Sequence, residues 1–294
     1  MQEFEFKNSF GDVLYGHKWE KEGNKKALAI ITGMAEHSAR YDDFANFLNN
    51  HGFNVYSIDH YGQGKNGTLG DPNCAFFMMI TKTYKELIDS LKEQGYTTYL
   101  FGHSMGSFVA QNFVQNYGNE IEKVIICGSN GKTALYNIGY RVANIVCNSK
   151  NKNEKAKLLH NLSFSGNNKK FKKEGNEFAW LSKNKENYEK YEKDPLCGYV
   201  CTNGFYQQFM TGLHSLHNKK LMKQINKDLQ ILIIAGELDP VGNYSKGVKK
   251  LEKEYVKYGV KDVKCIIYKD LRHEILNEVE KDDVYKDILE FLEK

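Results

Sequence analysis

Gly102-His103-Ser104-Met105-Gly106 has the pattern Gly-x-Ser-x-Gly and carries most of the information in this chain. The β-branched and aromatic residues at 97–101 predict a short buried strand, and the apolar residues of 107–114 follow helical spacing. A serine held in a sharp strand-to-helix turn needs small residues two positions before and after it, and glycine supplies both here. This context predicts that Ser104 is a nucleophile at the N-terminus of a helix. The alternative is an ordinary strand-to-helix turn.

Hydrophobic runs recur on both sides of this turn, with helical patterns between them. Several runs are apolar throughout, which is typical of parallel strands buried between two layers of helices. The alternation predicts an α/β protein with a mostly parallel, doubly wound sheet. Alternating residues around Phe10-Gly11-Asp12 predict that the sheet begins with an antiparallel hairpin. The expected strands after the hairpin are 27–31, 53–58, 99–101, 124–127, 231–234 and 263–268, and the expected helices are 43–50, 82–93, 107–117, 244–258 and 283–292.

The alternation breaks once, because no strong strand pattern occurs between residues 131 and 225. Residues 132–220 contain 15 lysines and one arginine against seven acidic residues, so their net charge is +9, whereas that of the whole chain is +4. We expect a helical cap at 131–225, inserted between two parts of the core at 1–130 and 226–294. Such a cap would cover the carboxyl edge of the sheet, where open α/β sheets bind ligands.

Two features of the expected cap bear on ligands. Phe205, Phe209 and Leu213 lie four residues apart and share one face of a helix. That face could line a pocket for an acyl chain, or it could only pack the cap against the core. The lysine-rich run at 167–173 is either a solvated surface turn or a region that attracts an anionic lipid surface.

A serine nucleophile needs a histidine base, and the histidine needs an acid that orients it. In enzymes with this serine turn, the acid and then the histidine follow the serine along the chain. Asp239 lies beyond the expected strand at 231–234, and Pro240 keeps it out of a helix. Glu237, two residues earlier, is the competing acid. His273 follows the last expected strand and is the only one of nine histidines after either acid.

An oxyanion formed during acyl transfer needs two backbone N–H donors. One expected donor is Met105, directly after the nucleophile. The other should come from the loop at 32–35, where Gly33 allows the backbone to turn and Met34 is the candidate.

Five motifs in this order resemble those of the monoglyceride lipase and lysophospholipase group of α/β-hydrolases. They are GMAEHSARY at 33–41, DHYGQG at 59–64, GHSMG at 102–106, GELDPV at 236–241 and RHEILNE at 272–278. Two cap segments, EFAWLS at 177–182 and DPLCG at 194–198, are similar to bacterial members called lysophospholipases. The resemblance extends from about residue 11 to the C-terminus. It implies hydrolysis of a monoacyl lipid ester through an acyl-enzyme, with Ser104, Asp239 and His273 as the catalytic triad.

The chain departs from this group at one position, because Thr32 stands before Gly33 where the group usually has histidine. The backbone N–H donor of Met34 does not depend on the side chain at position 32, whereas the effect of this change on the anchoring of the loop stays open. Serine aminopeptidases and amidases share the fold and the triad, so they remain an alternative, as does a non-catalytic binding protein of the same fold. A positively charged cap disfavours a substrate with an ammonium group.

The remaining sequence features are those of an ordinary globular enzyme. The six cysteines form no Cys-x-x-Cys pair and no zinc-binding set, which indicates reduced thiols in a cytoplasmic protein. Residues 1–7 are polar and alternating rather than typical of a signal peptide, and no apolar run is long enough to span a membrane. We expect a small-molecule or monoacyl lipid ester as substrate, with no metal, cofactor or nucleic acid. The oligomeric state stays open.

Overall fold

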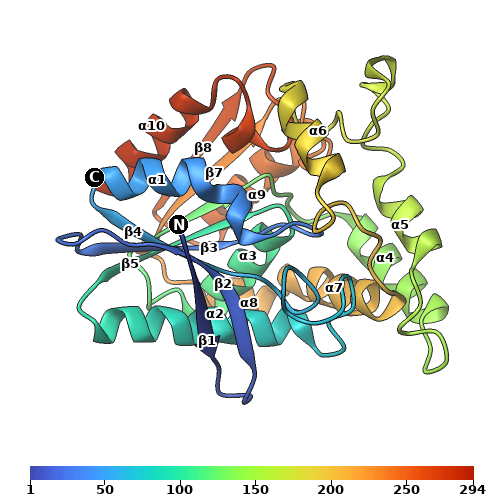
Figure 1. Cartoon of the computed structure of the whole chain (residues 1–294), viewed down its shortest axis with the longest axis horizontal. Helices are drawn as coiled ribbons and strands as arrows, with labels where there is room; N and C mark the ends of the chain where they lie inside the picture. Colours follow the sequence, from blue (N-terminus) through green and yellow to red (C-terminus); the bar gives the residue numbers. More distant parts are fainter.

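One eight-stranded sheet forms the centre of the computed structural model, which describes residues 1–294 (Figure 1). The strands are β1 (Gln2–Lys7), β2 (Val13–Trp19), β3 (Lys26–Ile31), β4 (Phe53–Ile58), β5 (Thr97–His103), β6 (Lys123–Cys127), β7 (Gln230–Gly236) and β8 (Asp262–Tyr268). Their order in the sheet is β1-β2-β4-β3-β5-β6-β7-β8. β2 pairs antiparallel with β1 and β4, and all other pairs are parallel. The predicted α/β class and the antiparallel hairpin are confirmed.

Ten helices accompany this sheet, and not all of them pack on it. They are α1 (Asp42–Asn50), α2 (Phe76–Glu93), α3 (Met105–Tyr117), α4 (Ala134–Val146), α5 (Lys157–Phe164), α6 (Lys185–Lys193), α7 (Asn203–Leu216), α8 (Lys219–Gln224), α9 (Lys246–Lys257) and α10 (Lys281–Glu293). One buried apolar cluster joins the sheet to α1 and α10, and a larger one joins it to α2, α3 and α9. Strands buried between two such layers explain why their sequences are apolar throughout. None of the ten helices has the length and apolar character that crossing a membrane requires.

Two helix starts differ from the predicted ones. α2 begins at Phe76, six residues before the expected start, because Phe76, Phe77 and Ile80 are buried against the core and extend its apolar face. α9 begins at Lys246 because the three residues before it have positive φ angles of 49°, 53° and 71°. A left-handed backbone cannot continue into a right-handed helix, so the expected start at residue 244 is wrong.

The segment at 131–225 contributes no strand to the sheet. It forms α4 to α8, with one 3-10 turn at Lys172–Glu174 and loops between them. α7 packs against α4 and also against α2, and α8 packs against α3. α5 lies at the right edge of the molecule, whereas α6 contacts the core loops through Tyr191 and Asn187 (Figure 1). We therefore propose residues 131–225 as a helical cap whose later helices are seated directly on the core.

Candidate active site

Ser104 forms the junction between β5 and α3. β5 ends at His103 and α3 begins at Met105, and Ser104 has φ +51° and ψ −119°. A non-glycine residue rarely has a positive φ, so this backbone is strained. A Cβ atom added to Gly102 would lie 2.4 Å from the Gly106 carbonyl oxygen, and one added to Gly106 would lie 2.1 Å from the Ile31 carbonyl oxygen. The predicted strand–turn–helix geometry is confirmed, and both glycines are sterically required.

The loops after β7 and β8 bring Asp239 and His273 together. His273 Nδ1 lies 3.0 Å from Asp239 Oδ1, and both side chains are buried. The same carboxylate oxygen accepts the backbone N–H of Val241 at 2.8 Å. Glu237 is exposed, and its carboxylate accepts the backbone N–H of Asp270 instead. The fold therefore places Asp239, rather than Glu237, beside the histidine.

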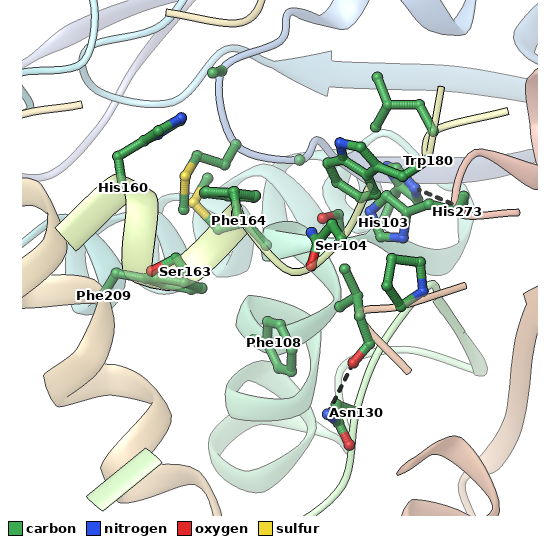
Figure 2. Close-up of a pocket in the computed structure, with 18 of the residues that line it drawn as sticks. His103, Ser104, Phe108, Asn130, His160, Ser163, Phe164, Trp180, Phe209 and His273 are labelled. Carbon is green, nitrogen blue, oxygen red and sulfur yellow. Dashed lines mark hydrogen bonds between the residues drawn. The ribbon is translucent and has the colours of Figure 1, made fainter. Parts of the chain in front are cut away.

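His273 and Ser104 line the same pocket, although no hydrogen bond joins their side chains (Figure 2). In unliganded enzymes this bond is often long and forms when substrate binds. Two rings pack against the His273 imidazole: Trp180 from the segment between α5 and α6 at 5.0 Å, and His103 at 4.8 Å between ring centroids. These contacts restrict how far the imidazole can move from the serine.

Two backbone N–H groups beside Ser104 are free to bind an oxyanion. Met105 is the first residue of α3, so its N–H has no partner within the helix. Met34 lies in the loop after β3, and its N–H donates no hydrogen bond to the backbone. A Cβ atom added to Gly33 would lie 3.2 Å from Ser104 Cβ, so this loop abuts the serine. Both methionines line the pocket, as an oxyanion hole requires.

The loop at Thr32 is anchored by residues of the DHYGQG motif. His60 Nε2 lies 2.9 Å from the Thr32 carbonyl oxygen, and Gln63 Nε2 donates to the Gly33 carbonyl oxygen at 2.8 Å. Thr32 Oγ1 also donates to Gln63 Oε1 at 3.3 Å. Burial lowers the pKa of His60 to about 4, so its ring is neutral at pH 7. Threonine in place of histidine at position 32 thus leaves the loop held through backbone carbonyls.

A buried ion network forms part of the pocket lining, and sequence analysis missed it. Arg40 donates to Glu36 Oε2 at 2.6 Å and to Glu274 Oε2 at 2.7 Å. Glu36 also accepts the Gly33 N–H at 2.5 Å and contacts His103 Nδ1 at 3.4 Å. Burial opposes the charge of Glu36, but His103 and Arg40 outweigh it and lower the pKa of that carboxyl. Glu36 and Arg40 are four residues apart, a spacing that is compatible with an ion pair. Glu274 is distant in the sequence and reaches Arg40 only because of the fold.

Removing the cation of this network should destabilise the protein. We expect Arg40→Met to lower the free energy of unfolding by about 3–5 kcal/mol at neutral pH, because it leaves two buried carboxylates unpaired. The pKa values of Glu36 and Glu274 lie below the usual 4.5 in the fold. The stability that these groups contribute is therefore present above the unfolded pKa and is lost as pH falls through the folded pKa.

In Arg40→Met the same carboxyls lose their cation, so burial should raise their pKa and let them bind protons as pH falls. The difference in stability between wild type and variant should therefore shrink toward about pH 5, near the ordinary pKa of glutamate. Urea unfolding at neutral pH and at about pH 5 measures this difference in the free energy of unfolding. A difference that stays constant or grows on acidification would contradict this account.

The pocket around Ser104 is a cavity of about 760 Å³ with an aromatic wall. Aromatic side chains on this wall include Phe108, Tyr136, Phe164, Trp180, Tyr199 and Phe209. Among the three side chains expected to line an acyl pocket, only Phe209 does so. Phe205 stacks on Phe76 with ring centroids 4.8 Å apart, and Leu213 is buried in the larger core cluster. Those two expectations are corrected: Phe205 packs on α2 and Leu213 is buried in the core, so neither side chain lines the pocket.

One group of potential metal ligands lies outside this pocket. The ligand atoms of His37, Asp194 and Cys197 lie within 4.8 Å of one another. His37 Nε2 is already 2.8 Å from Asp194 Oδ2, and burial raises the pKa of the Cys197 thiol. A protonated thiol is a poor metal ligand, so this group fits a contact between the cap and the core better than an ion site.

Comparison with known proteins places the chain among hydrolases. Residues 22–280 match the family described as "Serine aminopeptidase, S33". The chain belongs to this S33 hydrolase family. The match covers both parts of the core and the whole cap, so it extends over the serine turn, the Asp239–His273 pair and the pocket between them.

Relatives of this S33 protein include lipases. Human monoglyceride lipase is 30% identical over 110 residues, which are 35% of each chain. The monoglyceride lipase homologue of monkeypox virus is 32% identical over 112 residues, 35% of this chain and 38% of its own. A probable lysophospholipase L2 of Haemophilus influenzae is 25% identical over 122 residues, 39% of this chain and 38% of its own. The chain thus spans less than two fifths of the length of these relatives.

Solved structures match over nearly the whole chain. A thermostable carboxyl esterase from Bacillus coagulans, in complex with glycerol, has a TM-score of 0.91 at 24% identity and covers 99% of this chain and 97% of its own. The monoacylglycerol lipase of Paleococcus ferrophilus has a TM-score of 0.71 at 22% identity and covers 95% of this chain and 98% of its own. These likenesses confirm the α/β-hydrolase fold.

Proposed function

We propose that this S33 protein is a serine hydrolase that cleaves carboxylic esters, and that its substrates are monoacyl lipids such as monoacylglycerols or lysophospholipids. The observation that carries the proposal is the pocket itself. A strained serine, a buried His–Asp pair and two free backbone donors face one cavity with an aromatic wall. The lipase names of the relatives support the same substrate class.

In the proposed mechanism, Ser104 Oγ attacks the ester carbonyl carbon while His273 Nε2 takes the hydroxyl proton. Asp239 holds the Nδ1–H tautomer of the imidazole and stabilises its charge. The N–H groups of Met34 and Met105 bind the oxyanion of the tetrahedral intermediate. His273 then gives its proton to the departing alcohol, and water hydrolyses the acyl-enzyme by the same route. The protein's own residues supply every group that this reaction needs.

An aminopeptidase remains the second candidate because the family carries that description. A peptidase of this kind would hold a substrate ammonium with free carboxylates. The pocket is lined by three acidic side chains, and two of them, Glu36 and Glu274, are already paired with Arg40. Only Glu177 on the cap lies outside this network. The pocket therefore favours an uncharged or anionic ester over a cationic peptide.

Two measurements test the proposed function. A fluorophosphonate should label Ser104 in the folded protein, and the absence of an adduct would favour a non-catalytic binding protein. A substrate panel should then show faster cleavage of a monoacylglycerol or lysophospholipid than of a proline naphthylamide. The reverse order of rates would assign the protein to the aminopeptidases.

Phe209 should determine part of the preference for acyl chain length. Burial of each methylene gains about 0.8 kcal/mol, so kcat/KM should rise from acetyl to medium-chain p-nitrophenyl esters and then level off. Phe209→Ala should flatten this rise, because the side chain lines the pocket and packs 6.1 Å from the Phe108 ring. Phe205→Ala is the matched control, since Phe205 lies one helical turn away and faces the core. An equal flattening in both variants would contradict the assignment.

We also propose that the cap touches an anionic lipid surface and that the protein is cytoplasmic. Large apolar side chains are exposed on α4 and α5, including Ile145 with 81% of its surface accessible and Leu135 with 68%. Exposed lysines lie beside them at 150–157 and 169–173. Apolar side chains surrounded by lysines are typical of surfaces that bind anionic membranes. All six cysteines are free thiols, as a reducing compartment permits.

Vesicle sedimentation tests the proposed lipid contact. The protein should sediment with phosphatidylglycerol vesicles more than with phosphatidylcholine vesicles, and Ile145→Asp should weaken that binding because it places a charge where an apolar side chain would enter the interface. Val256→Asp is the matched control, since Val256 is an exposed apolar residue on α9 rather than on the cap. Equal binding by both variants would argue against the cap as the contact surface.

A further inference from the structure

Three lysines line the part of the pocket that lies at the start of α9. Lys132 follows β6, and Lys246 and Lys250 belong to the first five residues of α9. We call these three residues the lysine arm. All three are exposed, and none forms an ion pair with a carboxylate, although 11 other lysines do so elsewhere in the protein. Their charges are therefore available to a ligand.

Backbone contacts hold the lysine arm together. The Gly131 N–H donates to the Gly247 carbonyl oxygen at 3.1 Å, and Asn130 Nδ2 donates to the Val241 carbonyl oxygen at 2.8 Å (Figure 2). The Lys250 ammonium donates to the Lys132 carbonyl oxygen. The segment after β6 and the start of α9 thus form one wall, and all three lysines line the same pocket.

The electrostatics of this wall favour an anion. Acidic residues usually occupy the first turn of a helix, because they compensate the positive end of its dipole. α9 has no acidic residue in its first turn and carries lysines there instead. Lys170 of the cap lies close to the start of α9, with its Nζ 3.6 Å from the centre of the Tyr244 ring, but neither residue lines the pocket. A positive region without acidic partners is stabilised when a negative group binds to it.

The lysine arm and Phe209 border different parts of the pocket. Figure 2 shows Asn130, which borders the lysine arm, below Ser104, whereas Phe209 and His160 lie to the left of Ser104. An ester bound at Ser104 has two portions, an acyl chain and an alcohol. The acyl chain gains free energy against the aromatic wall. The alcohol portion of the substrate then extends toward the lysines.

We propose that the lysine arm binds a phosphate group on the alcohol portion of the substrate, so that the protein prefers monoacyl esters of phosphate-bearing alcohols to neutral ones. This inference rests on the proposed ester hydrolysis at Ser104 for its substrate, but not for the anion site itself. Three ammonium groups offer nine N–H donors, which suits the several oxygens of a phosphate.

Binding of octyl phosphate tests the anion site without any reaction. The variant Lys132→Gln/Lys246→Gln/Lys250→Gln removes the lysine arm. Lys25→Gln/Lys219→Gln/Lys253→Gln removes the same charge from exposed positions outside the pocket. By calorimetry, the first variant should bind octyl phosphate about tenfold or more weakly than wild type, while the control should differ by less than about twofold. Neutral octyl glucoside should distinguish the variants much less.

Hydrolysis provides the second readout. The ratio of kcat/KM for a lysophosphatidate to that for the monoacylglycerol with the same acyl chain should fall about tenfold or more in the lysine-arm variant, and added salt should lower this ratio in wild type. Equal octyl phosphate binding by wild type and both variants would overturn the anion site even if monoacylglycerol is cleaved. Lysine-dependent binding without cleavage of either ester would keep the anion site and refute the proposed function. Inorganic phosphate that binds as tightly as octyl phosphate would assign the lysines to a free anion and overturn the substrate proposal.

Discussion

Ser104→Ala is expected to lower kcat for p-nitrophenyl ester hydrolysis by about a thousandfold or more, because loss of a triad nucleophile normally costs several powers of ten. The expected loss is chemical rather than structural. Alanine adds no atom at this strained turn, and the Ser104 side chain does not cap α3. The two oxyanion donors belong to the backbone and persist in the variant. Steady-state kinetics measure the loss, and circular dichroism checks that the fold is retained.

Ser163→Ala is the matched control for this experiment. Ser163 lines the same pocket but belongs to α5 of the cap, away from the loops that hold the His–Asp pair. We expect this control to change kcat far less than Ser104→Ala does. Comparable turnover by wild type and Ser104→Ala would remove the serine from the mechanism, whatever the result of the control.

Asp239→Asn is expected to have the next largest effect, a fall in kcat of about a thousandfold or more near neutral pH. Asp239 Oδ1 accepts a hydrogen bond from His273 Nδ1 at 3.0 Å, which leaves Nε2 free to take the serine proton. An asparagine amide can donate to Nδ1 and so stabilise the wrong tautomer. KM should change less than kcat, because Asp239 does not line the pocket.

Glu237→Gln separates this role from a general effect of charge. It removes one carboxylate two residues from Asp239, but Glu237 is exposed and makes no contact with His273. Its activity should stay within about threefold of wild type, as is usual for exposed positions. If Glu237→Gln lost as much activity as Asp239→Asn, the assignment of the acid would have to be reversed.

Local patterns were sufficient to predict most of the fold. The run Ile231-Leu232-Ile233-Ile234 and the other apolar runs occur in the observed strands, because a strand buried on both faces must be apolar throughout. The boundaries at α2 and α9 were wrong for different reasons. Burial against the core extends α2 toward its N-terminus, and three consecutive positive φ angles delay α9. Neither effect leaves a clear local pattern.

Part of the site could also be predicted from neighbouring residues, whereas the rest depends on contacts between distant parts of the chain. Gly102 and Gly106 identify the serine turn in the sequence because the steric demand of the turn is local. The preference for Asp239 over Glu237 agrees with the observed contact to His273, since chain order and strand ends constrain which groups can meet. Of the three side chains predicted for an acyl pocket, only Phe209 lines the cavity. Helical spacing shows that Phe205, Phe209 and Leu213 share a face, but it cannot show which part of that face another helix covers.

The sequence by itself determined the α/β architecture, the serine turn and the chain order of acid and histidine, because each depends on neighbouring residues or on the periodicity of one element. The tertiary structure alone decided the Glu36–Arg40–Glu274 network, the packing of Trp180 on His273 and the presence of Lys132, Lys246 and Lys250 in the lining of one pocket. Arg40 and Glu274 are 234 positions apart. Contacts of this kind follow from how strands are ordered in the sheet and how the cap is seated on it, and no spacing along the chain encodes them.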